Sequence, residues 1–327
     1  PPGLEDLRRQ IARRSLDWGC SLSSDEILTT CGCIEALNLC LRAVAKPGDT
    51  IAVESPTYYG ILQIIEKLGM KALEIPSQCR DGISLEALNH ALERNKVTAC
   101  ILNTNSHNPL GSSMPDENKR HLVEMLARRE IPLIEDDVYG DIYFGAKRPK
   151  VAKAFDKKGL VLLCSSFTKT LTPGYRVGWT APGKFRAQVE RLKLSNTSGT
   201  PTLFQYVIAE FLESGGYDYF LRKIRRTFAI QVQLMIQAIR KYFPEETRVS
   251  RPTGGYVVWV EFPKWVDSLE LYRKAIGQKI SVAPGPLFSP KQHYRNFIRL
   301  NCGQHWSERF ERALVTLGRL VENQRSD

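Results

Sequence analysis

Short apolar runs alternate with segments of helical periodicity between residues 27 and 181, and this alternation constrains the fold more than any other feature of the chain. Helices are predicted where apolar side chains recur three and four residues apart, at residues 34–45, 60–69, 84–94 and 116–129. Strands are predicted at 27–30, 50–54, 71–75, 98–103, 131–135, 160–164 and 176–181. Such an order predicts an α/β domain with a mostly parallel central sheet that helices cover on both faces.

The pattern changes after residue 201, where longer helices are predicted at 202–213 and 217–242. Strands at 256–262 and 297–301 and a last helix at 307–323 complete a smaller α+β domain. A helix over residues 4–16 opens the chain, and its apolar stripe would suit either domain. We predict a large domain of residues 18–215 and a small domain that combines residues 1–17 with residues 216–327.

Composition excludes several classes of protein. No uncharged apolar run approaches the roughly 18 residues that cross a bilayer, and no signal-peptide pattern is present. The eight cysteines form no Cys-x-x-Cys pair, and no histidine stands at metal-ligand spacing from two of them. We therefore expect a cytoplasmic protein with reduced cysteines, no metal site and no membrane partner.

Positive charge is concentrated in the middle of the chain. The net charge is +11, and residues 147–240 hold 17 Lys and Arg against 5 Asp and Glu. A basic segment can attract phosphates or nucleic acid, but solvated helix faces are the better explanation for it. The chain has no helix-turn-helix pattern, so we expect no sequence-specific DNA binding by this segment. Because it opens at Pro1-Pro2-Gly3 without Met, we expect it to be part of a longer protein.

Candidate functional residues follow the predicted strands. Ligands of open parallel sheets bind beyond the carboxyl ends of the strands. A glycine that begins a helix, two aromatic residues, an asparagine, an aspartate and a lysine would meet there, and these are Gly32, Tyr58, Tyr139, Asn108, Asp136 and Lys169. Each has an ordinary interpretation when taken alone, such as a turn, a helix cap or a solvated loop lysine. Their joint occurrence in this order indicates a binding site.

Three motifs in this set resemble a known family. Asn108–Gly111 reads Asn-Pro-x-Gly, Asp136–Tyr139 reads Asp-x-x-Tyr, and Ser166–Lys169 reads Ser-x-x-Lys ahead of Arg176-Val177-Gly178. Together they resemble the fold-type-I pyridoxal-phosphate (PLP) enzymes of the class I/II aminotransferase family, over almost the whole chain. The segments 53–60 and 166–178 are similar more closely to the aminotransferase-like domain of GntR/MocR transcriptional regulators. In those proteins a winged helix-turn-helix domain precedes this one, and we expect that domain to be absent here.

The resemblance implies a role for each cofactor residue. Lys169 would hold pyridoxal 5′-phosphate as a Schiff base and carry a substrate proton, which a depressed lysine pKa favours. Asp136 would keep the pyridine nitrogen protonated, so that the ring acts as an electron sink. Tyr139 and Asn108 would hydrogen-bond the ring oxygen O3′, and Tyr58 would stack on the ring face.

The resemblance also implies two anion sites, one for the phosphate of the cofactor and one for the carboxylate of the substrate. The backbone N–H groups of Cys33 and Ile34 would bind the phosphate, as would three side chains, those of Ser166, Thr168 and Arg176. Arg299 would grip the carboxylate of an amino acid substrate, beside Asn108. Gly254-Gly255 and Pro284-Gly285 match loops near the substrate in that family, or are simple turns.

Three functions stay open at this point. The domain could sense an amino acid or amine effector for a regulator, binding DNA only through a separate upstream domain. It could instead be a working amino acid aminotransferase, or a PLP-dependent lyase or decarboxylase. In each case the resemblance implies a homodimer, and the identity of the substrate or effector is open.

Overall fold

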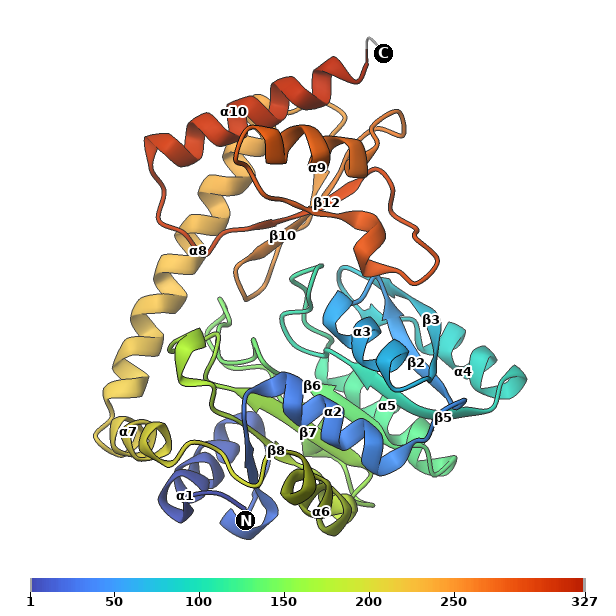
Figure 1. Ribbon diagram of the computed structural model, residues 1–327, viewed down its shortest axis with the longest axis vertical. Helices are drawn as coiled ribbons and strands as arrows, with labels where there is room; N and C mark the ends of the chain where they lie inside the picture. Colours follow the sequence, from blue (N-terminus) through green and yellow to red (C-terminus); the bar gives the residue numbers. More distant parts are fainter. Residues whose placement is uncertain (1, 326–327) are drawn as a thin grey trace.

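An eight-stranded sheet forms the centre of the larger part of the molecule in the computed structural model, which describes residues 2–325 (Figure 1). Its strand order is β1-β8-β7-β6-β5-β2-β3-β4. The strands are β1 (Leu28–Thr30), β2 (Thr50–Ser55), β3 (Lys71–Gln78), β4 (Gly82–Ile83), β5 (Val97–Leu102), β6 (Leu133–Asp136), β7 (Val161–Ser166) and β8 (Gly178–Ala181). The five strands from β7 to β3 pair in parallel, whereas β8 and β4 pair with their neighbours antiparallel. The predicted mostly parallel sheet is confirmed.

Helices cover both faces of this sheet. One face carries α2 (Cys33–Val44), α3 (Tyr59–Lys67) and α6 (Arg186–Asn196), and the other carries α4 (Leu85–Arg94) and α5 (Asp116–Arg128). Neighbouring residues of β5 point into opposite layers, since Ile101 packs with the first group while Cys100 and Leu102 pack with the second. A strand that is buried on both sides must be apolar at every position, which explains the uninterrupted apolar runs.

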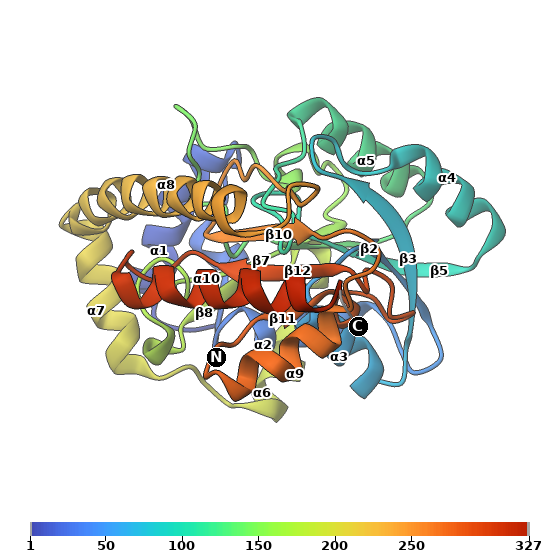
Figure 2. The same cartoon turned by 90° about the horizontal axis from the view of Figure 1, so that it is seen from above.

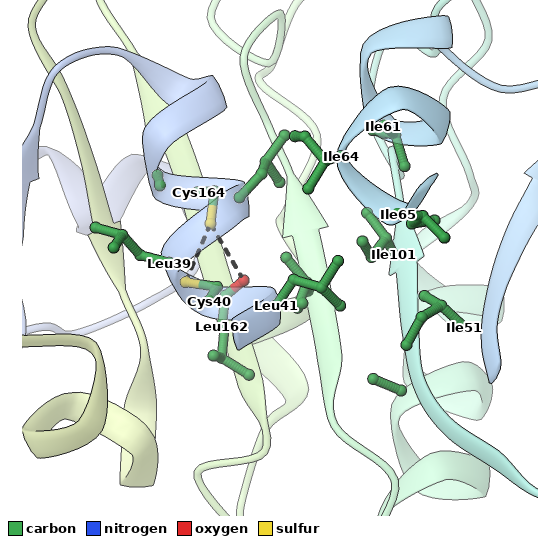
Figure 3. Close-up of a cluster of buried hydrophobic side chains, with 14 of the residues drawn as sticks. Leu39, Cys40, Leu41, Ile51, Ile61, Ile64, Ile65, Ile101, Leu162 and Cys164 are labelled. Carbon is green, nitrogen blue, oxygen red and sulfur yellow. Dashed lines mark hydrogen bonds between the residues drawn. The ribbon is translucent and has the colours of Figure 1, made fainter. Parts of the chain in front are cut away.

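Cysteines fill the core as small apolar side chains. Cys40 of α2 and Cys164 of β7 are fully buried, and their sulfur atoms lie 3.6 Å apart within the first of these layers (Figure 3). All eight cysteines of the chain are free thiols. Burial raises the pKa of the Cys164 thiol well above its usual value, so this side chain stays protonated.

The smaller part of the molecule is an antiparallel sheet with three helices on one face. The strand order is β11-β12-β10-β9, from β9 (Arg248–Val249), β10 (Val257–Glu261), β11 (Ala283–Pro284) and β12 (Phe297–Asn301). The helices are α8 (Gly216–Tyr242), α9 (Ser268–Gly277) and α10 (Glu308–Asn323). Seen from above, α10 lies between α8 and α9 over this sheet (Figure 2). None of the helices within residues 2–325 is long and apolar enough to cross a membrane.

The first helix, α1 (Glu5–Arg14), corrects one prediction. Its buried residues Leu7 and Ile11 pack with Trp179 of β8 and with α7 (Thr202–Glu213), far from the small sheet (Figure 1). Assigning residues 1–17 to the small domain was therefore wrong, because the apolar stripe of α1 is covered by the large sheet. A boundary near residue 216 stays a prediction, since α8 contributes residues to the apolar clusters of both parts.

Candidate active site

A cavity of about 230 Å³ lies between the carboxyl ends of the parallel strands and the small sheet. All eleven residues predicted to bind the cofactor or the substrate line it: Cys33, Ile34, Tyr58, Asn108, Asp136, Tyr139, Ser166, Thr168, Lys169, Arg176 and Arg299. They come from seven separate places in the chain, and the strand-end argument explains why the large-domain members meet. Lys169 and Asp136, on which the whole interpretation depends, share this one cavity.

Asp136 is the last residue of β6 and provides a buried carboxylate. The backbone N–H of Val138 donates to Asp136 Oδ1 over 3.1 Å, and the Cys33 thiol donates to the same atom over 3.5 Å. Asn103 Nδ2 donates to the Asp136 carbonyl over 2.6 Å and fixes the end of the strand. Burial raises the pKa of Asp136 to about 6, so the carboxyl is poised to exchange a proton with a basic nitrogen near neutral pH.

Lys169 lies three residues after the end of β7, with its Nζ 5.7 Å from the centre of the Tyr139 ring. No carboxylate oxygen of residues 2–325 lies within ion-pair distance of this ammonium. Burial lowers the pKa of Lys169, and the positive charge of Arg299 lowers it further. A lysine that loses its proton more readily is a better nucleophile toward a carbonyl group.

The start of α2 and the turn before β8 lie together at one end of the cavity. Gly32 has φ +89°, and a Cβ on it would lie 2.4 Å from Arg176 Nη2, so only glycine lets the guanidinium approach the helix start. Arg176 Nη2 donates to the Cys31 carbonyl over 2.8 Å. The hydroxyl of Thr168 is buried and has no hydrogen-bond partner. Free helical N–H groups, a guanidinium and an unpaired hydroxyl are the groups that bind a phosphate.

Arg299 provides the cationic group of the small domain. It alternates along β12 with Ile298 and Leu300, which point into the core, so Arg299 faces the large domain. Its Nη1 donates to Asn108 Oδ1 over 3.2 Å, while its buried Nε has no partner. No carboxylate of residues 2–325 pairs with Arg299. A guanidinium with spare donors in a cavity is suited to a carboxylate ligand.

Two tyrosines border the space between these charges. Tyr139 is buried, and burial raises its pKa well above the usual value, so it remains a neutral hydrogen-bond donor. Tyr58 precedes α3 and packs against Tyr59 with 4.6 Å between ring centres. Burial raises the pKa of Tyr58 to about 12, and it too stays neutral.

Other residues of the site escaped the sequence argument. Asn103 lines the cavity, and because it ends a predicted strand, the strand-end rule could have identified it. Tyr59 lies under the Arg299 guanidinium, 5.8 Å from ring centre to Cζ, and Tyr256 contacts Tyr139 edge-on. Gly254 and Gly285 do not line the cavity, and they allow close backbone packing instead.

The donor set fits pyridoxal phosphate. Phosphate-binding groups lie at one end, a buried carboxylate suits a ring nitrogen, and a lysine of lowered pKa suits an aldehyde. The unpaired Thr168 hydroxyl and Arg299 Nε are buried polar atoms that a bound anion would satisfy.

Comparison with known proteins agrees with this geometry. The family described as "Aminotransferase class I and II" matches residues 1–317. The chain is 43% identical to the uncharacterized HTH-type transcriptional regulator YdcR of Escherichia coli, over 98% of this chain and 69% of that protein. It is 30% identical to a 2-aminoadipate transaminase of Thermus thermophilus, over 98% of this chain and 80% of that enzyme.

Solved structures agree on the fold. The multiple substrate aminotransferase of Thermococcus profundus superposes with a TM-score of 0.92 at 26% identity, over 99% of this chain and 82% of that one. The α-aminoadipate aminotransferase LysN of Thermus thermophilus, complexed with N-(5′-phosphopyridoxyl)-L-leucine, superposes with a TM-score of 0.92 at 28% identity. The match covers 99% of this chain and 83% of that one. The predicted fold type I is thereby confirmed, and the chain belongs to the class I and II aminotransferase family.

Proposed function

We propose that this domain binds pyridoxal 5′-phosphate through Lys169, reacts with an amino acid or amine, and senses that ligand for a transcriptional regulator. The observation that carries the proposal is the shared cavity. It holds a lysine of lowered pKa, a buried carboxylate, the N-terminus of helix α2 and an arginine whose buried Nε has no hydrogen-bond partner. The bound cofactor would supply the carbonyl group and the electron sink that no protein side chain provides.

In this proposal each side chain has a separate task. Lys169 Nζ would hold the cofactor through its carbonyl carbon and would carry a proton at the ligand α-carbon. Asp136 would hold a proton on the ring nitrogen, and Tyr139 and Asn108 would hydrogen-bond the ring oxygen O3′. Tyr58 would exclude water from the ring.

The two ends of the cavity hold the anionic groups. The N–H groups of Cys33 and Ile34 and the side chains of Ser166, Thr168 and Arg176 bind the phosphate. Arg299 would orient the ligand carboxylate and thereby select which bond at the α-carbon reacts.

The regulatory role is supported by the relatives. The two E. coli proteins at 43% and 41% identity, YdcR and YjiR, are both named HTH-type transcriptional regulators. In such a protein the domain would reach DNA only through another part of the chain. A second candidate is a working aminotransferase, which the complete cavity and the 30% identical transaminase favour.

A homodimer is part of the proposal. Helix α7 exposes Leu203 and Tyr206 at 69% and 54% of their surface, and Val207 next to them is also exposed. An apolar hollow that includes Leu171 and Phe211 adjoins them. Apolar side chains gathered in this way are typical of a protein–protein interface.

The cofactor part is tested on the purified chain mixed with pyridoxal phosphate. We expect a visible absorbance band that borohydride abolishes and that Lys169→Ala lacks, because only a lysine amine forms the coloured linkage. Lys184→Ala, which removes an exposed lysine paired with Glu130, should keep the band. A wild-type protein without the band would contradict the proposal.

The same sample separates the two roles. Amino acids are added one at a time together with a 2-oxo acid acceptor. The amino acid that is the effector or substrate should change the visible absorbance spectrum. Sustained formation of a new 2-oxo acid would favour the enzyme, whereas a spectral change without turnover would favour the sensor.

A further inference from the structure

Two aromatic rings border the guanidinium of Arg299. Its Cζ lies 5.8 Å from the centre of the Tyr59 ring and 5.4 Å from the centre of the Phe288 ring. Tyr59 opens helix α3 of the large domain, whereas Phe288 ends a short helical turn, Gly285–Phe288, of the small domain. The rings meet edge to face, with 5.7 Å between centres and 74° between planes. They form a wedge, made by both domains, beside the arginine.

The surroundings hold both rings in place. Phe288 is fully buried, and Trp259 of β10 packs on it with 5.0 Å between ring centres. The Thr57 N–H donates to the Phe288 carbonyl over 3.0 Å, so the segment before α3 is bonded to the small domain. Tyr59 in turn packs against Tyr58, with 4.6 Å between centres. The wedge is therefore fixed relative to the residue that would stack on the cofactor ring.

Aromatic rings can hold a cation without occupying its hydrogen-bond donors. A ring attracts a nearby guanidinium through its π electrons, whereas an acidic side chain binds the N–H groups themselves. Within residues 2–325 no carboxylate pairs with Arg299, and its one hydrogen bond goes to Asn108 Oδ1. The buried Nε has no partner. Arg299 is thus held in the cavity while donors stay free for an anion.

We propose that Tyr59 and Phe288 are positioning residues that hold Arg299 ready for a ligand carboxylate, and that they thereby make the site select amino acids over amines. An arginine side chain has many rotamers, and ordering it at the moment of binding costs affinity. The wedge removes part of that cost before the ligand arrives. This inference rests on the proposed function, because it concerns a carboxylate bound by Arg299.

The test compares two stable adducts of the cofactor, N-(5′-phosphopyridoxyl)-L-alanine and N-(5′-phosphopyridoxyl)-ethylamine, which differ only by the carboxylate. Calorimetry on the cofactor-free full chain gives both dissociation constants, and their ratio isolates what the carboxylate contributes. Wild type should bind the alanine adduct more tightly. Tyr59→Leu should lower this preference about two- to fivefold, as expected for one lost cation–π contact, and Phe288→Leu should lower it similarly. Tyr59→Phe keeps the ring and should keep the preference.

Further variants make the result specific. Tyr59→Leu combined with Arg299→Met should show the same ratio as Arg299→Met alone, because the ring acts through the arginine. Phe310→Leu alters an aromatic residue that packs on Trp306 and does not line the cavity, so it should not change the ratio.

The outcomes distinguish this inference from the proposed function. A preference that is unchanged in Tyr59→Leu, or that falls equally in Tyr59→Phe, overturns the positioning role while the cofactor proposal stands. A fall of the same size on the Arg299→Met chain does so too. Equal binding of the two adducts by wild type also overturns the role of Arg299, and a wild-type chain that binds neither adduct overturns the proposed function as well.

Discussion

Replacing Asp136 by Asn should make the cofactor-free protein more stable near neutral pH. The carboxyl lies at the end of β6 with 5% of its surface exposed, and burial raises its pKa from 3.8 to about 6. Asn is close in shape, and its oxygen can still accept the Val138 N–H. The substitution therefore removes the cost of a buried charge and keeps the local packing.

The sign follows from where the proton is bound. Below about pH 4 the carboxyl is protonated in both folded and unfolded chains, and the folded state carries no penalty. Between pH 4 and pH 6 only the folded chain holds the proton, so the free energy of unfolding falls as pH rises. Above pH 6 the full penalty is present, and a shift of two pKa units corresponds to about 3 kcal/mol.

Urea unfolding, followed by tryptophan fluorescence at pH 4.5 and pH 7.5, measures this difference. The free energy of unfolding of Asp136→Asn minus that of wild type should be about 2 kcal/mol larger at pH 7.5 than at pH 4.5. Asp17→Asn changes an exposed carboxylate and provides the background for losing one charge. Equal differences between Asp136→Asn and wild type at the two pH values would refute the argument. The same variant should bind pyridoxal phosphate about 10- to 100-fold more weakly, because the ring nitrogen loses its anion.

Two further substitutions test the arginines. Arg299→Lys should weaken amino acid binding by about 10- to 100-fold in a spectral titration, because one ammonium cannot replace a two-point guanidinium contact. The affinity for the cofactor should stay near that of wild type. An equal loss of cofactor affinity would contradict this prediction. Arg148→Met leaves the buried carboxylate of Asp137 without an ion-pair partner and removes one of the two arginines that pair with Asp141, so it should lower the free energy of unfolding by about 3 to 5 kcal/mol. Arg248→Met, at an ion pair whose arginine is 82% exposed, should change it by less than about 0.5 kcal/mol, and similar losses for the two variants would count against the buried-pair argument.

The large domain could be predicted from the sequence because its signals are local. A strand buried on both faces is apolar throughout, and a covering helix repeats its apolar residues every three or four positions. Helix α6 lacks that signal, since only Val189 and Lys193 are buried along its eleven residues, and it was not predicted. The partner of α1 could not be read from its own stripe. Two of its ion pairs, Arg14 with Asp141 and with Asp218, join residues more than one hundred positions apart.

The same distinction separates the parts of the active site. Its large-domain residues end strands or begin helices, so their order along the chain already implies that they meet. Contacts between the domains have no such signal: Arg299 and Asn108, which hydrogen-bond, are 191 positions apart. Yet these contacts decide how a ligand could act. Arg299 stands on the small domain and Lys169 on the large one, so a ligand held by both would favour the arrangement that brings them together. A ligand shifts such an equilibrium only by binding one arrangement more tightly. Domain closure in an enzyme and signalling in a sensor both need a ligand that binds one arrangement of the domains more tightly than the other. The two roles differ in whether a product is then formed and released.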